Sequence, residues 1–331
     1  MSASATVPTP ASRTALPSPL LAWFFVFVWG SGYIATKAGL HYAPPLTFLS
    51  LRFAFGVLLL APLLLVAHRI SPLRWPATRA ELGHVVVAGL LMHAINLGGS
   101  HCAQYLGLSA GITALVLAAQ PLVTAVIVSA WGHERLGTRR WTGVLLGLFG
   151  VALVVWHRVD TAAASWGAIA SVLVSLTAIT IGTLYQRHYL PTVDLRTSTW
   201  IQFIVSLAVL APTAKLVEGF RYDFAWQMAA AIAYLVIFAS ILAVSALHTL
   251  MRRGQATRVT SLLYLTPLIA VALEWLLFAV QPSALTQLGV VVTCAGVALA
   301  TRAPSARASA AASAPASAPT AATATAGRAK P

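Results

Sequence analysis

Two stretches, LAAQPLVTAV (117–126) and LYLTPLIAVA (263–272), each place a proline in the middle of a long apolar run. A proline inside a helix removes one backbone hydrogen bond and bends the helix, so both stretches predict a broken helix. The two break points, Pro121 and Pro267, sit in matching surroundings. A repeated break of this kind suggests that one half of the chain is related to the other.

A constant shift along the sequence relates the residues around the two prolines. Moving the chain by 146 positions aligns residues 110–153 with 256–299 without a gap, and the glycines at 143 and 150 fall on glycines. Earlier in each half, FAFGVLLLAP ending at Pro62 matches FIVSLAVLAP ending at Pro212. This self-similarity predicts an internal duplication.

The composition is that of a membrane protein. Of the 331 residues, 59% are hydrophobic and only 8% are charged, whereas a soluble domain carries about 25% charged residues. Apolar runs of about 18 residues or more, long enough to cross a bilayer as helices, recur along most of the chain. The predicted spans are 19–40, 45–68, 81–104, 109–131, 139–157, 165–186, 196–214, 225–250, 255–280 and 284–302.

The predicted fold is therefore an all-α polytopic membrane protein with ten transmembrane helices in two repeats. Because five spans per repeat is an odd number, the second copy must cross the membrane in the reverse sense. The charges agree with this inversion, because the arginines of 135–140 align with uncharged residues in 281–286, and those of 252–258 align with uncharged residues in 106–112. Two inverted five-helix repeats are expected.

The domain boundaries follow from the same pattern. Residues 19–157 form the first five-helix repeat and 158–302 the second, inverted one. The flanking segments, 1–18 and the Ala/Ser/Pro-rich 303–331, cannot bury a core and are predicted to be disordered tails.

The placement of charge predicts the orientation in the membrane. With the N-terminus in the cytoplasm, the opposite side receives only Lys37, Arg158, Lys215 and Arg221 of the 21 lysine and arginine residues. This bias is the positive-inside pattern, so both termini are expected in the cytoplasm and the chain in the cell (inner) membrane. The net charge of +14 thereby has an explanation that does not involve nucleic acid.

Several short motifs stand at characteristic places in the spans: Trp29-Gly30-Ser31, Pro44-Pro45, Arg52, Pro121, Pro267 and Glu134-Arg135-Leu136. In these residues the chain resembles the EamA-type family of the drug/metabolite transporter superfamily, over about residues 19–302. The resemblance implies a ten-helix transporter of small metabolites, often an exporter. The chain departs from the family pattern at two places: His133 stands where the family usually has Gly before the Glu, and Val280-Gln281 stands where a Gly-Glu pair is expected.

The two helix breaks are candidates for the centre of a transport site. Each bend frees a backbone carbonyl near the middle of the membrane, where it must meet protein or water. Gln120 and Thr266 precede the two prolines at equivalent positions and are predicted to face a shared cavity. The alternative is a kink that only improves helix packing.

A polar stripe runs along the third predicted span. Steps of three and four place Gly89, His93, Asn96, Ser100 and Gln104 on one helix face. We expect His93 and Asn96 to line a water-filled path from mid-membrane outward. The alternative for His93 is a histidine satisfied by packing between helices.

Two charged residues inside spans are functional candidates, because an ionisable group within a bilayer is costly. Glu274, on one face of the ninth span with Tyr264 and Pro267, is the only acid away from the ends of a predicted span and a candidate for proton coupling. Arg52 lies at a similar depth, where it could pair with Glu274, bind a cargo carboxylate, or snorkel outward as a structural residue. Glu274 could instead be a neutral hydrogen-bonding group. Lys37, near a span end, is expected to be an interfacial anchor.

Aromatic residues with polar groups suggest where a cargo could bind. Trp29 and Tyr33 share a face of the first span, and Tyr185 ends a small-residue face of the sixth. Such residues suit a cavity for a moderately apolar, hydrogen-bonding molecule. Small-residue stripes are equally what close helix contacts require.

These features predict a secondary transporter that exports small metabolites such as amino acids by alternating access, with protons as a candidate coupling ion. The alternatives are an uptake carrier or a multidrug exporter; a channel or an intramembrane enzyme is disfavoured. No Walker A or H-E-x-x-H motif occurs and only two cysteines are present, so neither a cofactor nor a bound metal is expected. The expected partners are a small-molecule substrate and the lipid bilayer, and the sequence does not predict an oligomeric state.

Overall fold

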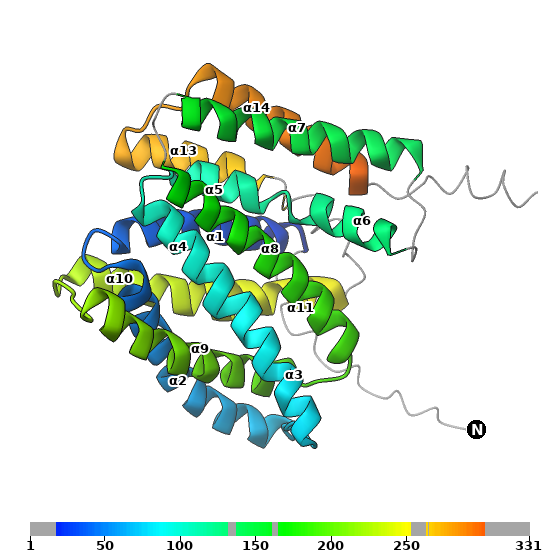
Figure 1. Cartoon of the computed structure of the whole chain (residues 1–331). Coiled ribbons are helices and arrows are strands. Elements are labelled where there is room, and N and C mark those ends of the chain that lie inside the picture. Colours follow the sequence, from blue (N-terminus) through cyan, green and yellow to red (C-terminus); the bar gives the residue numbers. More distant parts are fainter. Residues whose placement is uncertain (1–17, 132–136, 161–164, 253–262, 264, 302–331) are drawn as a thin grey trace, which may run out of the picture. The chain divides into compact units, whose positions relative to one another are not determined.

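The computed structural model describes residues 18–131, 137–160, 165–252, 263 and 265–301. Within these ranges the chain is all-helical (Figure 1). Eight of the described helices are long and apolar enough to cross a membrane, and Thr266–Phe278 and Ala284–Ala300 are shorter apolar helices. The expectation of a helical membrane protein is confirmed.

The elements, in which η denotes a π-helical segment, are α1 (Ser18–Gly39), α2 (Pro45–Ile70), α3 (Arg79–Gly89), η1 (Leu90–Ile95), α4 (Asn96–Tyr105), α5 (Ala110–Leu117), α6 (Gln120–Ala130), α7 (Thr138–Asp160), α8 (Trp166–Tyr189), α9 (Leu195–Glu218), α10 (Trp226–Ala233), η2 (Tyr234–Ala243), α11 (Val244–Arg252), α13 (Thr266–Phe278) and α14 (Ala284–Thr301).

Local sequence determines where these helices begin and end. Pro45 occupies the first turn of α2, where its missing N–H costs nothing. Ser109 and Ser165 cap α5 and α8 by accepting a hydrogen bond from a backbone N–H of the first turn. Gly219 ends α9 with a φ of 70°, a left-handed conformation that glycine adopts without strain.

Several predictions from the sequence concern residues outside the described ranges. They are Tyr264, the Glu134-Arg135-Leu136 motif, the first part of the ninth predicted span, and residues 1–17 and 302–331 of the two predicted tails.

The helical path is interrupted before Pro121, a helix begins next to Pro267, and two other spans contain wider, π-helical turns. α5 ends at Leu117 and α6 begins at Gln120, with Pro121 in its first turn. Pro267 stands in the first turn of α13. In addition, η1 interrupts the span that contains α3 and α4, and η2 interrupts the span after α10, as π-helical segments. No proline occurs in η1 or η2, and the sequence analysis did not predict them.

The most extensive contact is between α7 and α14, which run side by side (Figure 1). Glycines allow this approach, because a Cβ at Gly143 would lie 2.7 Å from the carbonyl oxygen of Gly296, and one at Gly289 would lie 3.0 Å from that of Gly150. Glycine pairs of this kind let two helix backbones pack closely in a membrane.

Gly296→Ala should destabilise this contact. The added Cβ would collide with the backbone of Gly147, and overpacking of this kind costs about 1–3 kcal/mol. We expect a lower melting temperature for the purified protein in detergent. Gly98→Ala is the matched control, because its Cβ would meet nothing within 4 Å; equal melting temperatures for the two variants would contradict the prediction.

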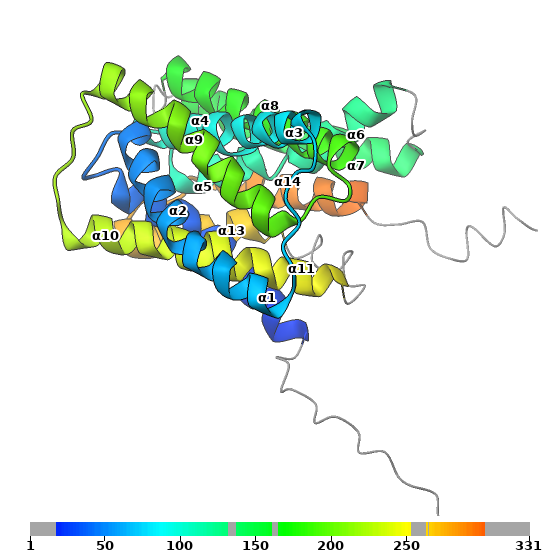
Figure 2. The same ribbon diagram turned by 90° about the horizontal axis from the view of Figure 1, so that it is seen from below.

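Five further contacts assemble the rest of the bundle. α2 packs on α9 (Figure 2), α4 on α8, α5 on α13, and α1 on both α13 and η2. The α4–α8 contact is close, since a Cβ at Gly99 would lie 2.6 Å from the carbonyl oxygen of Ser171. The small-residue face of α8 therefore serves helix packing.

Candidate functional site

Arg52 is buried in the interior of the bundle. Only 8% of the residue is exposed, and its one hydrogen bond to a described residue is from Nη2 to the hydroxyl of Ser240 in η2, at 3.2 Å. The side chain therefore does not snorkel outward. Among the described residues no carboxylate pairs with it, which leaves a buried cation with most of its donors available.

Two histidines lie near Arg52, within range of its charge. The ring of His93 packs edge-on against Phe53 and Phe203, with centroids 6.0 and 5.2 Å apart. His101 is 2% exposed, and its Nε2 has no hydrogen-bond partner in the described part of the chain. The interior around Arg52 therefore contains unsatisfied polar groups, and buried groups of that kind call for an explanation.

Glu274 is 3% exposed and binds three donors. Lys37 Nζ lies 2.7 Å from Oε1, and the N–H groups of Ala110 and Gly111 donate to Oε1 and Oε2 at 3.0 and 2.9 Å. We call this set, Lys37, Glu274 and the two N–H groups that begin α5, the clasp. It ties together α1, α13 and α5, with a carboxylate at the positive end of a helix.

The clasp bears on two alternatives that the sequence left open. Of the possible partners of Glu274, Lys37 pairs with it and Arg52 does not. Lys37, expected to be an interfacial anchor, also places its Nζ 4.7 Å from the centroid of the Phe278 ring. The stretch GLSAG (107–111) has the G-x-S-x-G spacing of a nucleophile elbow, a turn that exposes a catalytic serine in hydrolases. Here the Ser109 hydroxyl accepts the Ile112 N–H and serves as a helix cap.

A second carboxylate caps α2 in the same way. Glu218, at the end of α9, accepts the N–H of Leu46 at 2.9 Å and both the N–H and the hydroxyl of Thr47 at 2.7 Å. Close by, the Asp223 N–H donates to the carbonyl of Tyr42. These contacts bind the first turn of α2 to the end of α9.

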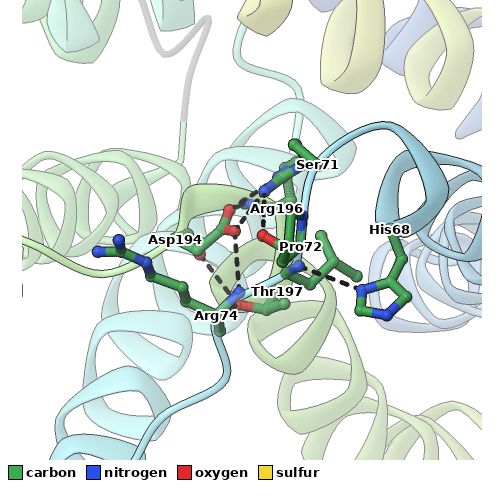
Figure 3. Close-up of polar contacts among 8 residues, drawn as sticks. His68, Ser71, Pro72, Arg74, Asp194, Arg196 and Thr197 are labelled. Atoms are coloured by element: carbon green, nitrogen blue, oxygen red, sulfur yellow. Dashed lines mark hydrogen bonds and ion pairs between the residues drawn. The ribbon is translucent and has the colours of Figure 1, made fainter.

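The opposite end of the α2–α9 pair is also fastened (Figure 3). Arg196 donates to Asp194 at 2.7 Å and to the hydroxyl of Ser71 at 2.8 Å. The Thr197 hydroxyl donates to the carbonyl of Arg74, and the Arg74 N–H donates to Asp194. Since both ends are bound, we expect α2 and α9 to move as one unit.

Asp194→Asn should weaken this fastening in a pH-dependent way. The hydrogen bond from Arg196 holds the pKa of Asp194 below its usual 3.8, so its stabilising contribution is present above about pH 4 and is lost as the pH falls through the lowered value. We expect the variant to melt below the wild type at pH 7 and to converge with it once the pH falls below the lowered pKa of Asp194. Asp223→Asn is the control, because that carboxylate makes no hydrogen bond or ion pair to a described residue; a pH-independent difference for Asp194→Asn would contradict the prediction.

Two predicted site residues lie on α1. Trp29 is 38% exposed and packs against Phe25, with ring centroids 5.3 Å apart. Tyr33 is half-buried. Next to Trp29, the hydroxyls of Ser31 and Tyr234 lie 2.6 Å apart, which joins α1 to η2.

The remaining predicted residues do not gather at one point. Ser175 donates to the backbone and side-chain oxygens of Asn96 at 2.7 and 2.8 Å, so Asn96 is buried against α8 and does not line an open path. Tyr185 contacts His84, with its hydroxyl 2.7 Å from Nδ1. Thr266 is buried, and its hydroxyl has no partner among the described residues.

Gln120 donates from Nε2 to the hydroxyl of Thr183 at 2.9 Å, which joins α6 to α8 at the helix break. Thr183 also lines a cavity of about 380 Å³. Sequence reasoning missed Glu218, Ser240 and His101. Glu218 was missed because it falls at a helix end, where acids are common.

Comparison with known proteins places these features in context. The model of a family described as the EamA-like transporter family matches residues 16–156 and 165–302. The "Uncharacterized inner membrane transporter YedA" of Escherichia coli strain K12 is 31% identical over 251 residues, which cover 74% of this chain and 78% of YedA. A "Probable amino-acid metabolite efflux pump" of the same strain is 25% identical over 289 residues, 84% of this chain and 92% of the relative.

The fold also has a counterpart among solved structures. A protein of known crystal structure superposes with a TM-score of 0.61 over 86% of this chain and 96% of its own, at 19% sequence identity. At that identity the likeness concerns the fold.

Proposed function

Because the chain belongs to the EamA-like transporter family, we propose that it is a secondary transporter that exports small carboxylate-bearing metabolites, such as amino acids, by alternating access. The observation that carries the proposal is Arg52, a buried cation whose charge no described carboxylate balances. Burial of an unpaired charge costs several kcal/mol, and a carboxylate on the cargo would offset that cost when it binds. The relative named as an amino-acid metabolite efflux pump supports the cargo class and the direction.

Two inverted five-helix repeats, 19–157 and 158–302, provide the frame for such a mechanism. Several contacts support this arrangement. The Gly143–Gly296 approach has its counterpart in Gly289–Gly150, with each pair related by the same shift of 146 positions. The π-helical segments η1 and η2 fall in the third span of each proposed repeat.

We further propose that both termini face the cytoplasm, as the arginine bias predicts. The clasp and the Glu218 cap then lie at the outer side, and the Asp194–Arg196 contacts lie at the inner side. The relative named as an inner membrane transporter supports the location. In this orientation the outer half of the broken helix, α5, is buried from Ala110 to Val116, whereas in α6 only Leu122 is buried. This difference in burial supports a conformation in which the bundle is closed at the outer side and packed more loosely at the inner side.

Glu274 is the proposed coupling residue. Opening the outer side must separate α1 from α13 and α5, which releases Glu274 from Lys37 and from the α5 N–H groups. A proton from outside can then bind the freed carboxylate. As the outer side closes and the inner side opens, the clasp regains its three donors and the proton leaves Glu274 toward the cytoplasmic side. Inward proton movement would then accompany outward cargo movement.

The proposal is tested by a metabolite screen joined to a flux assay. Cells that overexpress the protein and cells that lack it are compared for intracellular and medium pools of small metabolites. Any metabolite that accumulates in the medium on overexpression is then assayed in everted vesicles with an imposed proton gradient. Accumulation of an amino acid in the medium and saturable, counterflow-capable flux support the proposal. Depletion of a metabolite from the medium on overexpression would favour the uptake alternative. Export of a broad set of unrelated lipophilic cations would favour a multidrug exporter, and non-saturable flux would indicate a channel.

A further inference from the structure

The first helices of the two proposed repeats carry equivalent cations. A shift of 150 positions, which already aligns Pro62 with Pro212, places α1 on α8 and matches Gly32 with Gly182. The same shift brings Lys37 onto Arg187. The two cations would therefore stand at opposite ends of the bundle, one near each mouth of the transporter.

The partners of the two cations differ. Lys37 binds Glu274 in the clasp. The position equivalent to Glu274, 146 residues earlier, is Val128, so no acid stands at the equivalent position. Arg187 is exposed and makes no hydrogen bond or ion pair with a described residue. Its charge is available to a ligand.

Arg187 lines the cavity of about 380 Å³ described above, together with Met92, Thr183, Gln186, Leu190 and Pro191. The side-chain oxygen of Gln186 is buried there without a hydrogen-bond donor in the described part of the chain. Thr183, on the same wall, accepts a hydrogen bond from Gln120 at the break between α5 and α6. The cavity thus adjoins the helix break and offers one free cation and one unsatisfied acceptor.

We propose that this cavity is a loading site that captures the zwitterionic end of an α-amino acid before it moves to the interior. The Arg187 guanidinium binds the carboxylate, for which its planar fork is suited. On binding, the Gln186 side chain turns its oxygen, which is buried in the empty protein, toward the ammonium group and accepts a hydrogen bond from it, so an acceptor without a partner gains one. Met92 and Leu190 provide an apolar wall for the side chain of the amino acid. This assignment rests on the proposed function, of which it specifies the substrate class.

The site can be tested before the individual cargo is known. A cysteine placed in the cavity should be labelled more slowly by a thiol reagent when a ligand occupies the cavity. Pro191→Cys is made in a background in which Cys102 and Cys294 are replaced by Ala, and its rate of labelling by a charged methanethiosulfonate reagent is measured in everted and right-side-out vesicles. Three probe mixtures are compared: the common L-amino acids, their α-amides, which lack the carboxylate, and their N-acetyl derivatives, which lack the ammonium. Ala77→Cys, exposed outside the cavity, is the control.

The amino acids should slow labelling of Pro191→Cys in everted vesicles, about tenfold at ten times their Kd. The N-acetyl derivatives should protect less, and the amides should not protect. Arg187→Gln should abolish protection by the amino acids, and Gln186→Leu should reduce it to the level of the N-acetyl derivatives. Absence of protection, or equal protection in Arg187→Gln, would overturn the site while leaving a transporter of another cargo intact. Labelling only in right-side-out vesicles would instead refute the orientation on which the proposed function rests.

Discussion

Glu274→Gln is expected to abolish proton-driven transport while leaving cargo exchange measurable. The amide cannot carry the charge that Lys37 pairs with, and its NH₂ group would face one of the N–H groups that begin α5. Removal of one partner costs about 3–5 kcal/mol in a fully buried pair, and less here because a quarter of the Lys37 side chain is exposed. Proteoliposomes with an imposed pH gradient measure the coupling, and thermal melting measures the clasp.

Two variants make this prediction specific. Glu218→Gln removes the carboxylate that caps α2, which has no cationic partner among the described residues; it should lower the melting temperature without changing the dependence on the pH gradient. The charge exchange Lys37→Glu with Glu274→Lys should not restore stability, because it would place a cation at the positive end of α5. If the charge exchange restored the melting temperature, the clasp would be a simple ion pair. If transport by Glu274→Gln kept its dependence on the pH gradient, Glu274 would not be the coupling residue.

Arg52→Met is expected to abolish transport and to leave the melting temperature of the empty protein unchanged or higher. The melting temperature distinguishes a binding role from a structural role for Arg52. If Arg52 binds cargo, its charge is uncompensated in the empty protein, and an apolar side chain in its place removes a desolvation cost. Loss of a buried charge contact to cargo costs about 2 kcal/mol or more, a factor of roughly 30 or more in affinity. Transport rate and melting temperature are measured on the same preparation.

The control for Arg52 is Arg69→Met on the same helix, where the side chain is exposed; transport should be retained. Arg52→Lys keeps the charge but loses the planar fork, so it should transport carboxylate cargo with reduced affinity. A lower melting temperature in Arg52→Met with transport intact would show that Arg52 is a structural tie to Ser240.

Much of the architecture could be predicted from one sequence because a bilayer permits few solutions. Backbone groups in lipid must be paired within a helix, so apolar runs such as 45–68 identify spans directly, and α2 indeed covers Pro45–Ile70. Family membership was predicted from short motifs and is confirmed by the match over residues 16–156 and 165–302. The π-helical segments escaped prediction because neither proline nor charge marks them.

The site was predicted less well, and the reason is geometric. Periodicity assigns a residue to a helix face but does not say which helix that face meets. Asn96 was assigned to an open path and lies buried against Ser175. Glu274 was identified by the cost of its burial, yet its partner, Lys37, is separated from it by more than two hundred residues.

The sequence by itself determined that this protein is helical, lies in a membrane and belongs to a transporter family, because hydropathy, length and motif are local properties of a chain. Only the tertiary structure decided that Glu274 binds Lys37 and the start of α5, and that Arg52 is left without an acid among the described residues. Partner choice depends on the distance between side chains of different helices, and that distance is set by the packing of backbones through contacts such as Gly143 with Gly296.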